Sequence, residues 1–213
     1  YKKGRLHDMI KNNKACKARL LHYFPIESKG SEKKKESKTK GGDPFSDWCG
    51  WHNDHSSLTG LVVGQFVDTR TGKPIECPDP EAGLYIRSRK GELFQIKLPK
   101  SKEVHANNTL LFQIGESSQI HSGGLLQATP HAVRGASAPH VSRESYAVFM
   151  QPPMDEKMDV PQGVKPEAAQ SAQAAEQLPA RVPTLGSRYG TENCPFTACN
   201  YAAFTAESLA AYH

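Results

Sequence analysis

Three short stretches of the chain contain side chains that could bind a metal ion and an organic acid. The first holds His52 and Asp54, the second His131, and the third Arg143 and Ser145. Two imidazoles and one carboxylate are the ligand set of non-haem Fe(II) centres, which leave coordination positions open for oxygen and substrate. An arginine and a hydroxyl can together hold a carboxylate. No single stretch is specific, but their order and spacing together predict an oxygen-activating iron site.

The spacing of His52 and Asp54 is the reason for treating them as a pair. On a β-strand, side chains two residues apart leave the same face, so these two should aim at one point. The intervening Asn53 and the following His55 would point away, which favours His52 over His55 as the ligand. An isolated His-x-Asp is usually a surface pair. This one stands beside a buried strand, and a second histidine follows on a later strand.

Three later histidines compete for the remaining imidazole position. His121 lies in a Ser/Gly-rich turn and His140 follows a proline in a loop, whereas His131 lies in an apolar strand context. A strand fixes the face on which a side chain lies, so His131 is the expected second imidazole. Its ligand atom and those of the first pair should converge within about 3–4 Å of one another, given metal–ligand bonds of about 2.0–2.2 Å.

Arg143 and Ser145 repeat the two-residue spacing, and Phe149 shares their face. Arginine offers a planar fork for a carboxylate, and serine adds a hydroxyl. The ordinary alternative is a strand-edge arginine in a weak surface ion pair. An arginine among inward-facing apolar residues instead needs an anionic partner, because a lone buried charge is very costly. Tyr23, on the first expected strand, is a third candidate donor to the same carboxylate.

These side chains would be carried by short strands with little helix between them. Apolar runs and alternating apolar and polar residues, bounded by turn residues, are typical of strands. The expected strands are residues 18–24, 58–66, 83–87, 92–97, 109–114, 127–134 and 143–151. Residues 67–82 are rich in turn residues. This pattern favours an antiparallel sandwich, barrel or jelly roll over a parallel sheet.

The segments outside the strands have a different composition. Residues 1–17 carry apolar residues at helical spacing, and residues 201–213 look like a closing helix. Residues 27–47 form a polar insert that is expected to be flexible. Residues 156–200 are expected to be a linker or weakly ordered, and the Ala/Gln-rich stretch at 167–177 within them is expected to be a linker or a weak helix.

The overall composition is that of a globular protein with polar segments. The chain has 213 residues, of which 37% are hydrophobic and 23% charged, enough for one sizeable core. No apolar run is long enough to span a bilayer, and the Lys-rich start lacks a signal-peptide core. We therefore expect no membrane association and a cytoplasmic location.

Charge and cysteine usage bear on partners and compartment. The net charge is +5, and residues 29–40 hold six Lys and two Glu. A nucleic-acid patch or a nuclear signal is one interpretation, but no aromatic residue is interleaved to stack on bases, so a solvated loop without a nucleic-acid partner is expected. Five scattered cysteines argue against a disulfide framework and fit a reducing compartment. Cys194 and Cys199 lack the partner ligands of a zinc knuckle.

Parts of the sequence resemble a known enzyme family. WHNDHSSLTGL, TPHAV and RESYAVF are similar to the 2-oxoglutarate/Fe(II)-dependent dioxygenases, specifically the isopenicillin N synthase-like group. The resemblance implies a mostly β double-stranded β-helix (jelly roll, cupin-like) with flanking helices, and it places the catalytic jelly-roll domain at residues 18–155. The N-terminal half that is typical of full-length members is largely absent.

The resemblance also implies roles for individual residues. The implied iron ligands are His52, Asp54 and His131. The implied contacts to the distal carboxylate of 2-oxoglutarate are Arg143, Ser145 and Tyr23. Leu21 stands where plant-type members usually carry Asn, which puts one co-substrate contact in doubt.

The implied activity is oxidative decarboxylation. Fe(II), 2-oxoglutarate and O2 would be used to oxidise a small organic substrate by hydroxylation, desaturation or ring closure, with succinate and CO2 released. The protein, expected to be a monomer, would orient the substrate and exclude water. Three alternatives stay open: an iron oxidase that does not use 2-oxoglutarate, a truncated or degenerate metal-binding domain without activity, and a hydroxylase of protein or nucleic acid guided by the lysine run. The retained Arg143 and Ser145 count against the first of these.

Overall fold

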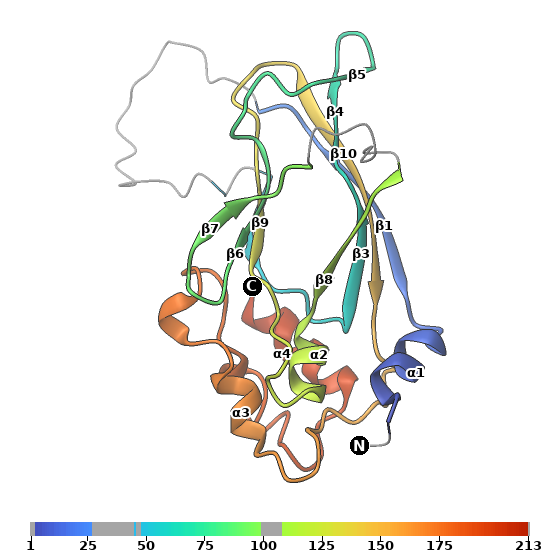
Figure 1. Ribbon diagram of the computed structural model, residues 1–213, viewed down its shortest axis with the longest axis vertical. Helices are drawn as coiled ribbons and strands as arrows, with labels where there is room; N and C mark the ends of the chain where they lie inside the picture. Colours follow the sequence, from blue (N-terminus) through green and yellow to red (C-terminus); the bar gives the residue numbers. More distant parts are fainter. Residues whose placement is uncertain (1–2, 27–44, 46–47, 99–107, 213) are drawn as a thin grey trace.

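The computed structural model describes residues 3–26, 45, 48–98 and 108–212. Two antiparallel sheets face each other, and the helices lie together at one end of the molecule (Figure 1). The predicted mostly β jelly roll with flanking helices is confirmed. Among the described residues, none of the helices is long and apolar enough to cross a membrane.

The larger sheet has six strands and is organised around the long strand β10. Its members are β1 (Lys17–Tyr23), β3 (Leu58–Val62), β4 (Gln65–Asp68), β5 (Lys73–Ile75), β8 (Leu110–Ile114) and β10 (Val141–Met150). The order is β5-β4-β10-β3-β8, and β1 pairs with β10. One edge of β10 pairs with β1, while the other pairs first with β4 and then with β3. The expected strand 58–66 is therefore two strands, with a break at residues 63–64.

The smaller sheet has four strands in the order β2-β9-β6-β7. Its members are β2 (Cys49–His52), β6 (Gly83–Arg87), β7 (Leu93–Gln95) and β9 (His131–Arg134). Trp51, Tyr85 and Ala132 from this sheet form a small core together with Phe45 and Val182. Phe45 is the one described residue of the insert at 27–47. The prediction that this insert is flexible therefore falls on residues that the structure does not describe.

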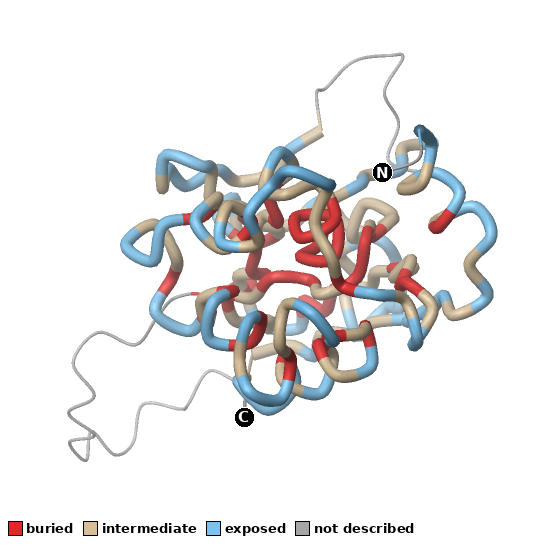
Figure 2. The backbone as a smooth tube through the Cα atoms, turned by 90° about the horizontal axis from the view of Figure 1, so that it is seen from below, coloured by how far each residue is buried: buried red, intermediate tan, exposed pale blue. Residues whose placement is uncertain are grey.

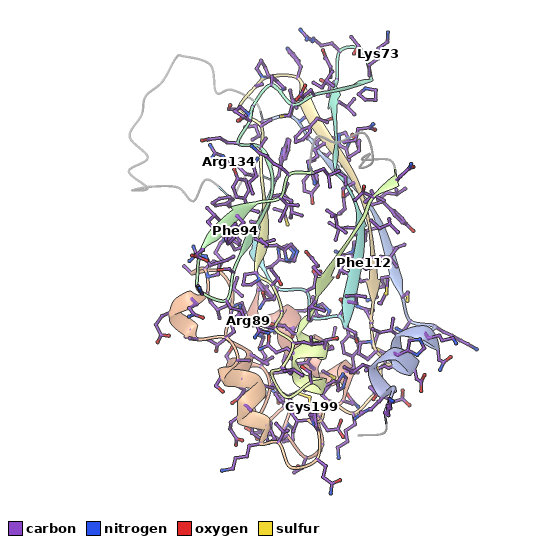
Figure 3. All side chains as sticks on the ribbon, in the orientation of Figure 1. Lys73, Arg89, Phe94, Phe112, Arg134 and Cys199 are labelled. Atoms are coloured by element: carbon purple, nitrogen blue, oxygen red, sulfur yellow. A yellow bond between two sulfur atoms is a disulfide. The ribbon has the colours of Figure 1, made fainter. Side chains whose placement is uncertain are left out.

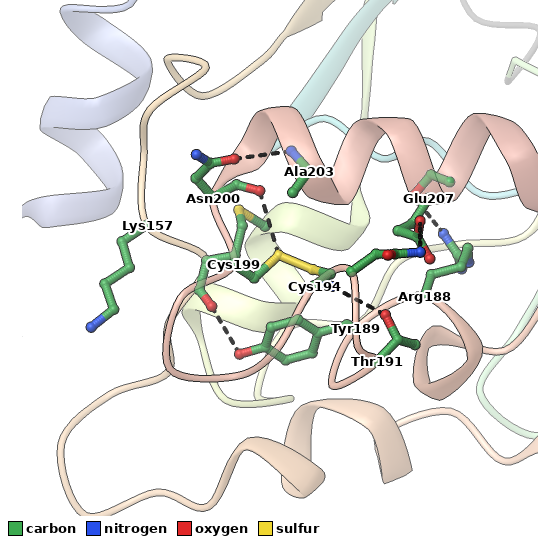
Figure 4. The surroundings of a disulfide bond; sticks show 12 residues. Lys157, Arg188, Tyr189, Thr191, Cys194, Cys199, Asn200, Ala203 and Glu207 are labelled. Carbon is green, nitrogen blue, oxygen red and sulfur yellow. Dashed lines mark hydrogen bonds between the residues drawn. A yellow bond between two sulfur atoms is a disulfide. The ribbon is translucent and has the colours of Figure 1, made fainter.

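Four α-helices occur in the described part of the chain. They are α1 (Arg5–Lys11), α2 (Glu116–His121), α3 (Pro166–Ser171) and α4 (Tyr201–Ala211). Helix α1 is shorter than the predicted 1–17 because it ends at Asn12. Helix α4 matches the expected closing helix, and the side chain of Asn200 caps it by accepting a hydrogen bond from the Ala203 amide (Figure 4). Strands β2 and β5 and helix α2 lie outside the expected strands and helices.

The segment 156–200 is packed into the structure, so the expectation of a linker or weakly ordered stretch was wrong for it. It joins α2 and α4 in a core whose buried members are Ile120, Met158, Ala169, Leu185, Tyr189, Cys194, Cys199, Tyr201 and Phe204. Figure 2 shows buried backbone running through the centre of the molecule. The Ala-rich composition reflects close packing: a Cβ on Gly124 would lie 2.6 Å from the carbonyl oxygen of Ala168.

A disulfide joins Cys194 to Cys199 within this core (Figure 4). Both cysteines are buried, and the Cys194 amide donates a hydrogen bond to the Thr191 hydroxyl. The odd number of cysteines had argued against disulfides, and that expectation was wrong for this pair. The zinc-knuckle alternative fails as well, because the two sulfurs are bonded to each other. The other three cysteines are free.

Candidate metal centre

The structure brings His52, Asp54 and His131 together. Their ligand atoms all lie within 4.8 Å of one another, and Asp54 Oδ1 lies 3.8 Å from the Nε2 atom of each imidazole. His52 ends β2, and the directly paired His131 begins β9. Asp54 lies just beyond the end of β2, so the convergence comes from the chain leaving the strand as well as from the two-residue spacing. The distances from Asp54 to the two imidazoles fall within the predicted range of about 3–4 Å. The limit of 4.8 Å for all ligand atoms is larger than that range.

Both imidazoles are held in the tautomer that a metal ligand needs. His52 Nδ1 donates to the Gly50 carbonyl oxygen at 2.8 Å, and His131 Nδ1 donates to that of Thr129 at 3.0 Å. Because each Nδ1 carries a proton, Nε2 is the atom that can bind a metal once the ring is neutral, and both Nε2 atoms face Asp54. A backbone carbonyl commonly fixes the ring of a metal-binding histidine in this way.

The two oxygens of Asp54 have different partners. Oδ2 accepts hydrogen bonds from Thr59 Oγ1 at 2.5 Å and from Gln113 Nε2 at 2.6 Å. Oδ1 faces the imidazoles. Burial acts against ionisation of this carboxyl, but the charges of His131 and His52 and the two hydrogen bonds lower its pKa. Asp54 is therefore an anion with one oxygen free to bind a metal.

The two histidines differ in protonation. Burial lowers the pKa of His131 to about 4, and the charge of His52 acts in the same direction. Burial also acts to lower the pKa of His52, but its hydrogen bond to Cys49, the electrostatic interactions with Cys49 and Asp54, and the Gly50 carbonyl raise it to about 9. Without a metal, the cluster therefore holds one proton, on His52, at neutral pH.

Three further histidines of the described residues, His55, His121 and His140, are not part of this cluster. The His55 ring lies 6.1 Å from that of Tyr201, and His121, in α2, contacts the carbonyl oxygen of Lys157 through Nε2. His140 lies in the turn before β10 with a φ of 61°. The structure thus brings His52 and His131, and not these three, beside Asp54, and their role as metal ligands stays a prediction.

Arg143 is the second notable group. It is only 5% exposed, and its guanidinium lies 5.5 Å from the centre of the Tyr23 ring. The guanidinium lies so close to the backbone of Gly64 that a Cβ added at that position would overlap it. No Asp or Glu of the described residues pairs with Arg143; its electrostatic partners are Tyr23 and Cys49, and burial lowers its pKa. A buried cation without an anion is costly, so this position favours binding of an acidic group.

Tyr23, Ser145 and Leu21 surround the same region. Tyr23 is directly opposite Arg143 in the β1–β10 ladder, and Leu21 is directly opposite Ser145. Directly paired residues share a face, so all four line one side of the sheet. Arg143, Ser145 and Leu21 also line an open cleft of about 1620 Å³. This cleft does not reach the cluster of His52, Asp54 and His131.

Two features connect Arg143 with the metal cluster. Along β10, alternate residues share a face, and Thr59, which holds Asp54, pairs with Phe149 on that face. In addition, Cys49 Sγ lies 3.7 Å from His52 Nδ1 and interacts electrostatically with both Tyr23 and Arg143. The metal cluster and the arginine are thus neighbours in the space between the sheets.

A network of polar residues from the helical end contacts Asn53, which lies between His52 and Asp54. Asn53, between the two first ligands, donates its side-chain amide to Glu116 Oε1 at 3.0 Å and its backbone amide to Tyr212 Oη at 2.9 Å. Glu116 in turn binds both terminal nitrogens of Arg188, at 2.5 and 2.6 Å. Glu116 and Arg188 are each 1% exposed. Asn53 points away from the cluster, as the strand spacing predicted.

Sequence reasoning missed four residues that shape the site: Thr59, Gln113, Cys49 and Gly64. Gln113 carried a readable signal, because it is a polar residue at an inward position of the apolar strand LLFQI. The contact between Gly64 and Arg143 joins the β3–β4 break to β10, and such a contact leaves no mark in the sequence.

Comparisons with known proteins identify the fold. No protein-family model matches the chain, and no curated protein matches it. A putative 2OG-Fe(II) oxygenase family protein from Caulobacter crescentus superposes with a TM-score of 0.53 at 19% identity, over 97% of this chain and 48% of that chain. Full-length Neurospora crassa T7H in complex with alpha-KG gives 0.50 at 18% identity, over 91% and 44%. Its complex with alpha-KG and thymine gives 0.50 at 20% identity, over 92% and 44%.

These structures confirm the predicted resemblance at the level of the fold, which is the jelly roll of 2OG-Fe(II) oxygenases. The isopenicillin N synthase-like subgroup stays a prediction. The chain spans less than half the length of the structures that it matches.

Proposed function

We propose that this chain is the catalytic unit of an Fe(II)- and 2-oxoglutarate-dependent oxygenase that oxidises a small organic molecule. The observation that carries the proposal is a pair of sites between the sheets. Two imidazoles and one carboxylate converge within 4.8 Å, and a buried arginine nearby has no carboxylate partner among the described residues. The ligand residues are His52, Asp54 and His131. The residues for the distal carboxylate are Arg143, Ser145 and Tyr23.

The donor set fits Fe(II). Two neutral imidazole nitrogens and one carboxylate oxygen, all on one side, are the donors of oxygen-activating non-haem iron centres. When bound, Fe(II) would supply the redox chemistry by which O2 decarboxylates 2-oxoglutarate to succinate and CO2 while a substrate C–H bond is oxidised. Hydroxylation, desaturation and ring closure are the outcomes that such chemistry allows.

The chain's own residues would bind, orient and exclude water. The Gly50 and Thr129 carbonyls hold the imidazole rings. Arg143 would bind one carboxylate of 2-oxoglutarate through its planar fork, with Ser145 beside it. Leu61 and Ala147, paired on adjacent strands between Thr59 and Arg143, would present an apolar wall. We place the catalytic domain at residues 18–155, with the helical end packed against it. A monomeric state and a cytoplasmic location stay predictions.

The test is a stepwise anaerobic titration, first with Fe(II) and then with 2-oxoglutarate, followed by oxygen-dependent succinate release. Arg143→Ala should keep the Fe(II) affinity and lose about 2–5 kcal/mol of 2-oxoglutarate binding, typical of truncating one member of a buried charge pair. Arg143→Lys should recover part of the loss, because lysine lacks the fork. Ser145→Ala should cost about 1–3 kcal/mol, typical of a hydrogen bond to a charged group.

Arg70→Ala is the matched control, because Arg70 is exposed and its ion-pair partner among the described residues is Asp68 beside it. It should bind both ligands as the wild type does. Equal 2-oxoglutarate affinity in the wild type and Arg143→Ala would instead favour an iron oxidase that uses another reductant. Metal binding without any succinate release would favour a metal-binding domain without activity.

A further inference from the structure

Two residues of the larger sheet hold the carboxylate that follows a strand of the smaller sheet. Thr59 on β3 and Gln113 on β8 are directly opposite each other in the antiparallel ladder. Their side chains therefore leave the same face of the sheet. Both donate to one atom, Asp54 Oδ2, at 2.5 and 2.6 Å. These distances are at the short end expected for hydrogen bonds to a charged acceptor.

This arrangement decides which oxygen of Asp54 can bind a metal. Oδ2 has its two donors, whereas Oδ1 lies 3.8 Å from both imidazole Nε2 atoms. To bring both oxygens to a metal, Asp54 would have to turn and break bonds to Thr59 and Gln113. The carboxylate is thus oriented as a ligand with one oxygen.

Gln113 makes one more contact, to a ligand. Its Nε2 lies 3.0 Å from His131 Nε2, which carries a lone pair because His131 Nδ1 donates to Thr129. A primary amide has two N–H groups, so one serves Asp54 and the other His131. A metal would take the lone pair of His131. The amide must then leave His131 while it keeps its bond to Asp54.

We infer that Thr59 and Gln113 are positioning residues that restrict Asp54 to one metal-binding oxygen, and that Gln113 releases His131 when a metal enters. The inference rests on the proposed function. His52, His131 and one oxygen of Asp54 would hold the metal and leave coordination positions for other ligands. A second oxygen from Asp54 would take one of those positions. The clamp therefore preserves the positions that 2-oxoglutarate and O2 require.

The test uses Co(II) as the probe, because its visible absorption changes with coordination number and needs no turnover. Thr59→Val keeps the shape of the side chain but removes the hydroxyl, and Gln113→Met keeps its length but removes the amide. We expect each to weaken Co(II) binding roughly ten- to hundredfold, as loss of a partner of a metal ligand usually does, and to change the Co(II) spectrum. Thr59→Ser should restore both values to those of the wild type.

Phe112→Leu is the matched control on the same strand. Phe112, labelled in Figure 3, is 58% exposed and lies next to Gln113 in sequence, with its side chain on the opposite face of β8. It should leave the affinity and the spectrum unchanged. Gln113→Glu adds a carboxylate beside the metal position, and it should bind Co(II) more tightly but 2-oxoglutarate more weakly than the wild type.

The outcomes separate the two proposals. If the wild type fails to bind Co(II), or binds it as well after His131→Ala, the proposed metal site itself is wrong. If the wild type binds Co(II) through His131, but Thr59→Val and Gln113→Met keep its affinity and spectrum, the clamp is wrong and the metal site stands. Circular dichroism of each variant checks that the fold is retained.

Discussion

Gly64 shows how the absence of one side chain shapes the acid-binding region. The backbone at this break between β3 and β4 lies against the Arg143 guanidinium, where a Cβ would overlap it. The overlap is with the end of a flexible side chain, so the strands themselves need not move. Arg143, however, would have to leave its place over the Tyr23 ring.

Gly64→Ala should therefore weaken 2-oxoglutarate binding about tenfold, which corresponds to about 1.4 kcal/mol, without lowering Fe(II) affinity. Anaerobic calorimetric titration measures both. Gly186→Ala is the control, because an added Cβ there meets only Gln170 atoms at ordinary contact distances of 3.5–3.8 Å. Undiminished 2-oxoglutarate affinity in Gly64→Ala would mean that Arg143 does not hold the co-substrate from its present position.

The protonation of the two histidines leads to a prediction about pH. His52 has a pKa of about 9 and His131 a pKa of about 4, so His52 alone is protonated at neutral pH. Ligand histidines bind metal in the neutral form, and the metal must displace that proton. Metal affinity should be highest above about pH 9 and should fall about tenfold for each unit of pH below it, until His131 also begins to protonate.

Co(II) titrations at about pH 6, 7 and 8 measure this slope. Calorimetry in buffers of different ionisation enthalpy should count about one proton released for each metal bound near neutral pH. His52→Ala should lose both the slope and the proton release. An affinity in the wild type that does not change with pH would contradict the assignment of the proton to His52.

At the level of elements, sequence patterns predicted those strands and helices that are determined by the residues within them. Strand β6 was predicted with the bounds that the structure has, because alternation along GLYIR is complete within the strand. Strand β5 was missed because its three residues are too few to show an alternating pattern, and it is recognised as a strand only by its pairing with β4. Helix α2 was missed because its six residues, ESSQIH, are all buried although five of them are polar, so no apolar stripe marks the helix in the sequence.

The site was predictable in part for the same reason. The convergence of His52 and Asp54 follows in part from their two-residue spacing and in part from the chain leaving β2 before Asp54. The supports of Asp54 do not, because Thr59 and Gln113 reach it through the register between β3 and β8. Likewise, the Ala-rich stretch around α3 looked like a linker. Its small residues are what allow close approach to the loop after α2.

The buried ion pair between Glu116 and Arg188 leads to a prediction at this scale, because it connects α2 to the segment before α4. Arg188→Met should destabilise the protein by about 3–5 kcal/mol, since Glu116 is left as an unpaired buried charge. Fe(II) affinity should fall as well, because Glu116 also holds Asn53 between the ligands. Urea unfolding and metal titration measure the two effects.

Arg70→Met, at the exposed pair with Asp68, is the control and should change neither quantity measurably. Restoration of stability when Glu116→Leu is combined with Arg188→Met would show that the uncompensated charge causes the loss. A stable Arg188→Met protein with normal metal affinity would show that the helical end does not support the site.

At the scale of the whole molecule, the metal ligands join the two sheets. His52 and His131 belong to the smaller sheet, and Asp54 is held by residues of the larger one. A bound ion would therefore connect both layers of the fold. The jelly-roll class was predictable from many short strands with short connections. The position of the helical end was not, because it depends on contacts between segments far apart in sequence.

Metal removal should accordingly lower the melting temperature of the whole molecule. A ligand at a hundredfold excess over its Kd stabilises the folded state by about 2.7 kcal/mol. For a chain of this size, that corresponds to a shift of roughly 5–10 °C. Anaerobic scanning calorimetry with Fe(II) and then with a chelator should show the shift in the wild type, and none in His131→Ala. An equal shift in both proteins would place the stabilising metal elsewhere.

The rate at which the buried disulfide between Cys194 and Cys199 is reduced can measure how often the helical end opens. Both cysteines are at most 1% exposed, so a reductant in solution reaches the bond only when the start of α4 opens. The rate at which thiols appear under excess reductant would then report how often that opening occurs. Tyr212, just after α4, holds the backbone of Asn53. The same rate would therefore tell how long the metal site keeps its support, in a measurement that needs neither metal nor substrate.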